Sequence, residues 1–496
     1  MRSKWQPDRL RCSRGERASS PLVISRGASA GVWARRLIIL LSLGTLIALP
    51  AIWVSSQYFE KDVAAPLSYM ARDGWCEVGV SPNAGIHCFG DYASQALTAE
   101  HDFGIGDRDF TKGPYPSDPK AAYNSLYPPI GQFPHVVSDL LREGFAGRQP
   151  AFYAYFAFLL LAVLSPAIWL GWLWRRSALL LIPLVVIGIA TLPVIAVLDR
   201  ANSAGFIVPL LLAFVLFLRR DPPWLSPAMA VGAALIRPQF ALLLLALLAL
   251  GRWRSAVASA FAIVGITVVS FALTAGGLVP SLSSWWTNLT QFQGGTGDIR
   301  LPAPANISMA RSVVGVAQWV QNVPGPLGSI GDWLVPAIYR YPLIPTACLV
   351  VVTAVVFSLC RRTIPRSVVI VIPLALAAMA STVSPAYYLT FALVIAAMIM
   401  GAMVVGARPP GMLDCREERT PWFWGWPLVI AIAFSLAPLP FARDALPDAP
   451  VPRSAIILEN IGKAWLVVVL IGLVWAALRA WRARSAVSPA ARPPAP

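Results

Sequence analysis

The residues best suited to acid–base chemistry lie in one polar segment, residues 57–149. Asp91 stands beside a glycine in the sequence Phe89-Gly90-Asp91-Tyr92. A carboxylate within hydrogen-bonding reach of a hydroxyl group can accept its proton as the hydroxyl oxygen attacks, and Gly90 permits close approach. Taken alone, this part of the chain is more simply interpreted as a solvated acidic loop. Other carboxylates follow closely and could be the base instead, or bind a divalent cation: Glu100, Asp102, Asp107 and Asp109.

The same segment concentrates the polar side chains of the chain. It holds all three histidines, His87, His101 and His135, and 12 of the 24 acidic residues. The rest of the chain is strongly apolar. We therefore expect any chemistry on a water-soluble group to take place beside this segment.

The composition is that of a polytopic helical membrane protein. Mean hydropathy is +0.64, and only 13% of the residues are charged. Many apolar runs approach the length of about 20 residues that a bilayer core requires. Lipid forces a spanning backbone into helices or closed barrels, and continuous apolar runs favour helices over alternating strands. The sequence thus predicts an all-α bundle of transmembrane helices. About twelve spans are expected, near residues 37–55, 151–173, 178–198, 204–218, 225–236, 239–250, 255–278, 342–360, 367–383, 386–407, 422–440 and 464–480.

The net charge of +16 does not indicate a nucleic-acid partner, because the basic residues stand in short clusters at span ends. Such clusters are typical of cytoplasmic loops. Alternation from a cytoplasmic N-terminus then places both termini inside and residues 57–149, 279–340 and 441–463 outside. The clusters are Arg35-Arg36, Arg175-Arg176, Arg219-Arg220, Arg252 with Arg254, Arg361-Arg362 with Arg366, Arg408, and Arg479 with Arg482 and Arg484.

This topology divides the chain into three parts. Residues 1–36 are expected to form a disordered, basic cytoplasmic tail, residues 37–481 the transmembrane domain, and residues 482–496 a Pro/Ala-rich cytoplasmic tail. Cys76 and Cys88 share the outer segment, where a disulfide could close a short loop. No cysteine or histidine spacing indicates zinc.

One pair of predicted spans is too short. Residues 224–250 lie between basic clusters assigned to the inside, yet at about 1.5 Å per helical residue they cannot cross a core of about 30 Å twice. Either the bilayer thins locally or this is a broken hairpin with Arg237-Pro238 at its tip. A partly buried arginine facing a cavity would indicate a functional site. The alternative is an arginine that extends to the outer headgroups.

Three further features suit the outer face but are weak when each is taken alone. Tyr127-Pro128-Pro129 forces an extended turn, and residues 136–141 then resemble a short amphipathic helix at the membrane interface. Asp199-Arg200-Ala201-Asn202 stands at the outer end of a span, where Asp and Asn are also ordinary helix caps.

The order of these motifs resembles glycosyltransferase family 87, from about residue 37 to about residue 400. Members of this family are integral membrane enzymes of the GT-C class that use polyprenyl-phosphate sugars. The motifs that carry the resemblance are Gly90-Asp91-Tyr92, Tyr127-Pro128-Pro129, Asp199-Arg200-Ala201-Asn202, Ala234-Leu235-Ile236-Arg237-Pro238, Gly251-Arg252-Trp253-Arg254, Asn306-Ile307-Ser308 and Ser384-Pro385-Ala386-Tyr387-Tyr388.

The resemblance implies an inverting transfer of mannose or a related sugar to a glycan or lipid-linked acceptor, on the outer face of the plasma membrane. Asp91 would be the general base, and Arg237 would hold the lipid phosphate by bidentate hydrogen bonds. The resemblance implies no cofactor, and it leaves open whether the enzyme needs a divalent cation. The residues expected to bind substrate are Tyr92, Tyr127, Asn202, Arg237, Asn306 and Tyr387.

Two departures from the family pattern concern the donor. Family members commonly have lysine at the position of Arg237, and often a tryptophan or histidine soon after the Ser-Pro motif, where this chain has Tyr387-Tyr388. The second departure leaves the donor sugar undetermined.

A transporter or flippase for a lipid-linked or small polar solute is the alternative function, since about twelve spans and a broken hairpin would suit it too. Transporters usually bind solutes near the membrane midplane. Here the ionisable residues instead crowd the outer segment at residues 57–149, which favours an enzyme.

Overall fold

The computed structural model describes residues 30–58, 90–103, 123–144, 148–173, 191–218, 223–294, 306–404, 421–437 and 453–487. Every regular element in these ranges is a helix, and none is a strand. The predicted all-α class is therefore confirmed for the part of the chain that is described. Cys76, Cys88, Asp107 and Asp109 lie outside these ranges.

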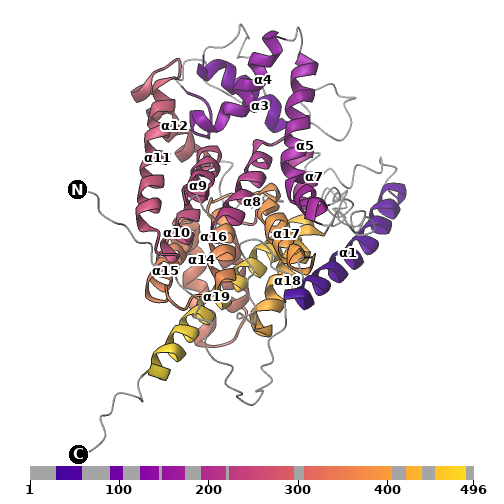
Figure 1. Ribbon diagram of the computed structural model, residues 1–496, viewed down its shortest axis with the longest axis vertical. Helices are drawn as coiled ribbons and strands as arrows, with labels where there is room; N and C mark the ends of the chain where they lie inside the picture. The colour runs from indigo at the N-terminus through magenta and orange to yellow at the C-terminus, as the bar shows by residue number, and fades with distance from the viewer. Residues whose placement is uncertain are drawn as a thin grey trace, which may run out of the picture.

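Helices lie in the predicted spans as far as these are described (Figure 1), whereas residues 178–190, most of the predicted span 178–198, lie outside the described residues. Short 3-10 turns, labelled η, start several of the helices. The elements are α1 (Ala30–Tyr58), α3 (Gly90–Phe103), η2 (Pro129–Gln132), α4 (Phe133–Gly144), α5 (Arg148–Leu173), α7 (Leu192–Arg200), η3 (Ser203–Phe206), α8 (Ile207–Phe217), α9 (Leu225–Ile236), η4 (Pro238–Leu243), α10 (Leu244–Ala249), α11 (Trp253–Ala272), α12 (Leu278–Gly294), α13 (Met309–Gln321), α14 (Pro326–Arg340), α15 (Ile344–Leu359), α16 (Arg366–Met379), η5 (Ala386–Leu389), α17 (Thr390–Val404), α18 (Trp422–Leu436) and α19 (Arg453–Val487).

Three described helices are long and apolar enough to cross a membrane, in α5, α11 and α19. A fourth span is possible if α14 and α15, which meet at a 99° bend, are counted as one. Large apolar side chains of α11 point outward, as on a helix that faces lipid; Phe261 is 75% exposed. The protein is thus a membrane protein, and the number of about twelve spans stays a prediction.

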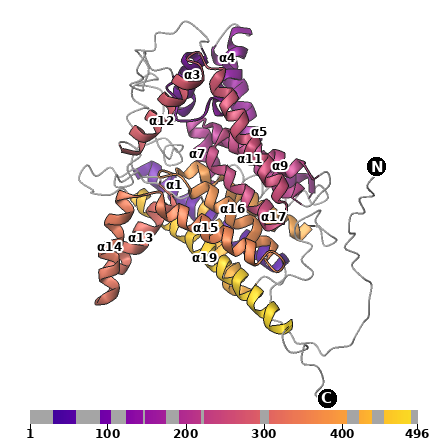
Figure 2. The same ribbon diagram turned by 90° about the vertical axis from the view of Figure 1, so that its left-hand side faces the viewer.

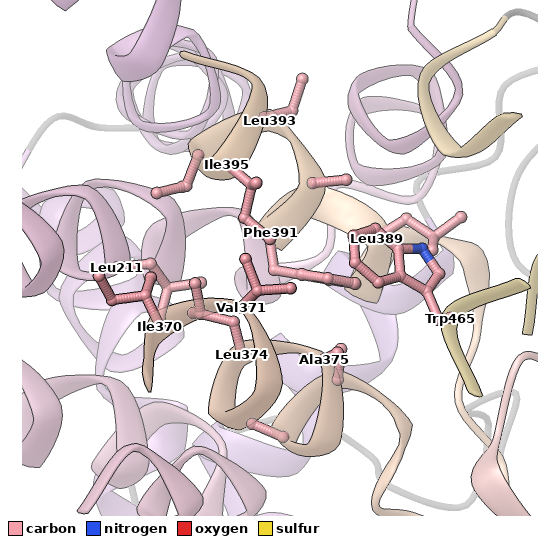
Figure 3. Packing of buried hydrophobic residues seen from close by; sticks show 14 of the residues in the cluster. Leu211, Ile370, Val371, Leu374, Ala375, Leu389, Phe391, Leu393, Ile395 and Trp465 are labelled. Carbon is pink, nitrogen blue, oxygen red and sulfur yellow. The ribbon is translucent and has the colours of Figure 1, made fainter. Parts of the chain in front are cut away.

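The core of the bundle is formed by α16 and α17. All residues from 368 to 379 are buried, so α16 has no lipid-facing side. Figure 3 shows Phe391 of α17 against Trp465 of α19, with their ring centroids 4.5 Å apart. Tight packing of this kind fixes the helices that carry the site.

The outer segment lies at one end of the bundle. In both views α3, α4 and α12 lie together at the end away from the C-terminal part of α19 (Figures 1 and 2). The backbone N–H of Ala275, in the turn before α12, donates to the carbonyl of Asp102 in α3 at 2.9 Å. Trp285 of α12 donates from its indole N–H to the carbonyl of Leu126 at 3.1 Å. These contacts join α12, the first helix of the predicted outer segment 279–340, to the outer segment 57–149.

Arginines gather at the opposite end. Arg252 donates to the carbonyl of Leu218 at 3.1 Å, and Arg484 donates to that of Leu359 at 3.3 Å. The Arg361 guanidinium lies beside Gly251. Segments that are far apart in sequence, and that were all predicted to be cytoplasmic, therefore meet at one face, which favours the predicted orientation.

The orientation can be tested by cysteine labelling in a background that lacks the native cysteines. Ser117→Cys, in the outer segment, should react with a membrane-impermeant maleimide in intact cells. Ser485→Cys, at the exposed end of α19, should react only after lysis. The reverse pattern would contradict the topology.

The structure differs from the predicted boundaries in three places. The second outer segment, residues 279–340, is largely helical because apolar faces of α13 and α14 pack together, with Val314 and Val335 among the buried residues. Helix α1 begins at Ala30, inside the predicted tail at residues 1–36. Helix α19 runs on to Val487, past the predicted start of the C-terminal tail at residue 482.

Candidate active site

Arg237 is buried in the bundle, with 1% of its surface exposed. It stands where α9 ends, in an extended conformation (φ −141°, ψ 108°), because the following Pro238 cannot continue the helix. The predicted break at Arg237-Pro238 is therefore present. Burial of the guanidinium is at variance with an arginine that extends to the outer headgroups.

Asn202, Ser203 and Tyr127 contact the guanidinium and orient it. Its Nη2 donates to Asn202 Oδ1 at 2.9 Å and to Ser203 Oγ at 3.1 Å. Its carbon Cζ lies 3.6 Å from the centroid of the Tyr127 ring, a cation–π contact. Three residues predicted to bind substrate, Tyr127, Asn202 and Arg237, thus form one cluster.

Asn202 also caps a helix. Helix α7 ends in the left-handed residue Ala201 (φ 50°), and Asn202 Oδ1 then accepts the Ala204 N–H at 2.8 Å to start η3. The Tyr155 hydroxyl donates to the carbonyl of Ala201 at 3.0 Å. The capping interpretation of this asparagine is therefore confirmed, and the same oxygen also accepts from Arg237. Binding of substrate by Asn202 stays a prediction.

Gly131 brings the outer segment against the end of α9. A Cβ at this position would lie 2.9 Å from the carbonyl oxygen of Ile236. A larger residue would push η2, and with it Tyr127, away from Arg237. Gly131 thus lets the turn after Tyr127-Pro128-Pro129 lie close to the end of α9, where Arg237 stands.

Tyr92 belongs to the neighbouring aromatic cluster. Its hydroxyl is 2.7 Å from Ser138 Oγ, and its ring centroid is 4.7 Å from that of Tyr155. The His135 ring stacks on Tyr155, with centroids 5.2 Å apart, and its centroid lies 5.8 Å from that of Tyr92. Since Tyr155 also bonds to Ala201, the cluster of Tyr92 is continuous with that of Arg237.

Helix α4 has its polar side turned into the protein. Phe133 and Leu140 are exposed, whereas His135 and Ser138 are buried. An amphipathic helix of this kind lies at a membrane surface with its apolar face toward lipid. The predicted helix is present as α4, and its residues His135 and Ser138 face the interior of the protein.

Sequence reasoning did not assign a role to His135. Neither of its ring nitrogens has a hydrogen-bond partner among the described residues, and the side chain is 1% exposed. Burial, and then the charge of Arg237, lower the pKa of His135 to about 3, so the imidazole is neutral at physiological pH. A buried polar atom without a partner costs about 1–3 kcal/mol. The polar residues Gln132, His135 and Ser138 recur every three positions, and the residues between them are apolar. This spacing is the signal that could have identified His135.

Asp102 is a structural carboxylate. It is fully buried and accepts the Asn124 N–H and the Gln132 Nε2–H, both at 2.9 Å. His101 Nδ1 lies 3.1 Å from Asp102 Oδ1, the oxygen that accepts the Asn124 N–H. Burial, and then Asp102, raise the pKa of Tyr123 well above its ordinary value. These donors occupy both carboxylate oxygens, and within the described ranges no three His, Cys, Asp or Glu side chains are grouped to hold a metal ion.

Asp102→Asn should therefore cost stability and not chemistry. The amide offers one acceptor where two oxygens now accept, so we expect a loss of about 1–3 kcal/mol of unfolding free energy. Thermal unfolding in detergent measures the loss, and turnover per folded protein should stay near that of the wild type. A variant of full stability and no turnover would instead make Asp102 a catalytic residue.

Two other predicted site residues stand at η5 and α13. Asn306 is buried and bridges two loops: Nδ2 donates to the carbonyl of Thr382 and Oδ1 accepts the Ser384 N–H, both at 3.0 Å. This bridge fixes the loop before Tyr387. The neighbouring Tyr388, which the sequence reasoning passed over, places its hydroxyl beside the Arg237 and Gln239 side chains.

Asp91 is the second residue of α3, next to Tyr92. Its side chain is outside the described part of the structure, as are those of Glu100 and Asp199. The backbone at Asp91 is nevertheless placed, because Tyr92 is anchored to Ser138 and Tyr155. The candidate base is therefore carried by the helix that contacts the Arg237 side of the bundle through α4, η2 and α7.

A comparison with known families bears on this arrangement. The model of glycosyltransferase family 87 matches residues 126–364. This segment is similar to glycosyltransferase family 87. The resemblance inferred from the motifs is confirmed over this segment, a little under half of the chain, and implies a glycosyltransferase. No curated protein and no solved structure matches the chain.

The family 87 segment covers much of the cluster and not all of it. Tyr127, His135, Asn202 and Arg237 lie inside it, as does Asn306. Asp91 precedes the segment, and Tyr387-Tyr388 follows it. The residues around the guanidinium are thus within the matched region, while the role of Asp91 depends on its position in the fold.

Proposed function

We propose that this protein transfers a sugar from a polyprenyl-phosphate donor to a glycan or lipid-linked acceptor on the outer face of the membrane. The sugar is mannose or a related one, and the anomeric configuration is inverted. The observation that carries the proposal is the buried Arg237, fixed by Asn202, Ser203 and Tyr127 at the end of the bundle that holds the outer segment.

The guanidinium suits a lipid phosphate for three reasons. Its planar fork of N–H donors matches two phosphate oxygens. The amide of Asn202 and the hydroxyl of Ser203 accept from it and fix its orientation. A buried site has a low effective dielectric constant, which strengthens the attraction to an anion. Arg237 would thus bind the donor and stabilise the phosphate as it leaves.

The reaction then needs one base. The acceptor hydroxyl oxygen forms a bond to the anomeric carbon while the bond from that carbon to the phosphate oxygen breaks. The electron pair of the broken bond stays on the polyprenyl phosphate beside Arg237. The hydroxyl proton passes to the Asp91 carboxylate, which is the role of a general base. Attack from the side opposite the phosphate inverts the configuration.

The exposed apolar face of α4 suits a donor that is itself a lipid. Phe133 is 59% exposed and Leu140 is 54% exposed, on the side away from His135. A helix lying in the outer leaflet with its polar side toward Arg237 would bring the headgroup of a membrane lipid to the site without removing its chain from the bilayer.

The direct test is to incubate membranes containing the protein with radiolabelled polyprenyl-phosphate sugars. We expect label to move into a glycan or glycolipid product. Membranes containing Asp91→Asn at equal protein level are the control. Movement of intact donor across the membrane with no product would instead support the flippase alternative.

A further inference from the structure

Two buried polar side chains at η2 and the start of α4 have hydrogen-bonding atoms that the described residues do not use. They are Gln132, through Oε1, and His135, through both ring nitrogens. Both side chains are buried, at 0% and 1% exposure. They stand three positions apart across the junction of η2 and α4, so they lie on one side of this helical segment. Unused polar atoms of this kind in a native core call for an explanation, such as a ligand or an ordered water.

The surroundings show that this side of α4 was not built for packing alone. A phenylalanine at position 135 could stack on Tyr155 as the imidazole does and would leave no polar atom unmet. Gln132 already donates from Nε2 to Asp102 and to the Tyr123 hydroxyl, at 2.9 and 3.0 Å, which fixes the direction of its amide and leaves Oε1 as an acceptor. The amide therefore cannot rotate to give Oε1 a hydrogen-bond donor without breaking the two bonds from Nε2.

A neutral imidazole presents one donor and one acceptor. His135 is held neutral by its burial and by Arg237. Each hydroxyl group of a sugar also donates and accepts one hydrogen bond, so imidazole and sugar hydroxyls are complementary. Inorganic anions offer only acceptors, and they would leave the imidazole acceptor and Gln132 Oε1 unmet.

We propose that His135 and Gln132 bind hydroxyl groups of the donor sugar. This inference rests on the function proposed above and extends it, because Arg237 would hold the phosphate and these two residues would hold the sugar next to it. A site that forms hydrogen bonds to a substrate hydroxyl strongly disfavours an analogue that lacks this hydroxyl. His135 is then a residue that selects the donor sugar.

The decisive variant is His135→Phe, assayed with polyprenyl-phosphate mannose and with its monodeoxy analogues. The wild type should use at least one deoxy analogue about tenfold less well than the parent donor, and His135→Phe should lose that preference. Its kcat/KM for the parent donor should fall about tenfold or more. Its thermal stability in detergent without donor should equal or exceed that of the wild type. His135→Gln, which keeps a donor and an acceptor, should restore part of kcat/KM.

The matched control is His101→Phe. This histidine lies against Asp102 on α3, so the change should lower stability and leave the preference among deoxy analogues as in the wild type. If His135→Phe kept the wild-type preference and lost stability, His135 would be a structural residue and the inference would be wrong. A wild type that transfers no sugar from any donor would contradict the proposed function itself, and the inference with it.

Discussion

Asp91→Asn is expected to lower turnover by about a hundredfold to ten-thousandfold, the usual contribution of a general base. An amide has nearly the shape of a carboxylate and cannot accept the proton of the acceptor hydroxyl. Because Asp91 is the second residue of α3, a carboxylate that only stabilises the start of this helix would instead cost about 0.3–1 kcal/mol and leave turnover largely intact. Turnover at equal protein level in the membrane separates the two roles.

The controls for this experiment come from the same outer segment. Asp107→Asn and Asp109→Asn remove the same charge from neighbouring positions. Asp102→Asn is unsuitable, because the structure gives this carboxylate buried partners whose loss would lower the amount of folded protein. Comparable losses in several variants, together with inhibition by chelators, would point to a metal site. Near-normal turnover of Asp91→Asn would move the search for the base elsewhere.

Arg237→Ala should weaken donor use by about 10- to 100-fold, the equivalent of about 1.5–3 kcal/mol for hydrogen bonds to a charged group. The loss should appear in the apparent affinity for the donor, because the phosphate is bound before the reaction begins. Arg237→Lys keeps the charge without the planar fork, so it should retain part of the affinity. Steady-state kinetics with purified protein measure both effects.

Truncating a buried arginine also disturbs the fold, so stability must be measured beside affinity. Arg252→Ala is the matched control, since Arg252 also donates to a neighbouring segment but lies at the opposite end of the bundle. It should leave the apparent donor affinity unchanged. An Arg237→Ala variant with wild-type donor affinity would show that the guanidinium has only a structural role.

Apolar runs determined most of the fold that could be predicted. They predicted most of the helices that the structure describes, and the shortness of residues 224–250 located the break at Arg237. Helix boundaries were less certain, because α13 and α14 are amphipathic pieces inside a segment that reads as polar. The contact between these two helices, through residues such as Val314 and Val335, is known only from the structure.

The site was predicted in part, for a physical reason. The motifs named Tyr127, Asn202 and Arg237, and the fold brings these residues together. The sequence could not show that Asp102 is buried, because its donors, Asn124 and Gln132, are more than twenty positions away. In the same way, the turn that carries Tyr127 to Arg237 depends on the contact of Gly131 with Ile236 across the fold.

The burial of His135 was not predicted, because the polar face of an amphipathic helix is ordinarily expected to face water. Helix α4 has the opposite arrangement, with Phe133 and Leu140 outside and His135 inside. In a membrane enzyme the polar face of an interfacial helix can instead face an internal site. This inversion is a consequence of lipid, which makes an exposed apolar face favourable.

The central claim is tested most directly with the purified protein reconstituted into liposomes. The reaction contains a glycan or lipid-linked acceptor and polyprenyl-phosphate mannose labelled in both the sugar and the lipid. The account predicts that glycosylated product and free polyprenyl phosphate appear in equal amounts. It also predicts that Asp91→Asn binds the donor yet forms neither. Donor that crosses the bilayer uncleaved, at the same rate in both proteins, would contradict the account and identify a flippase.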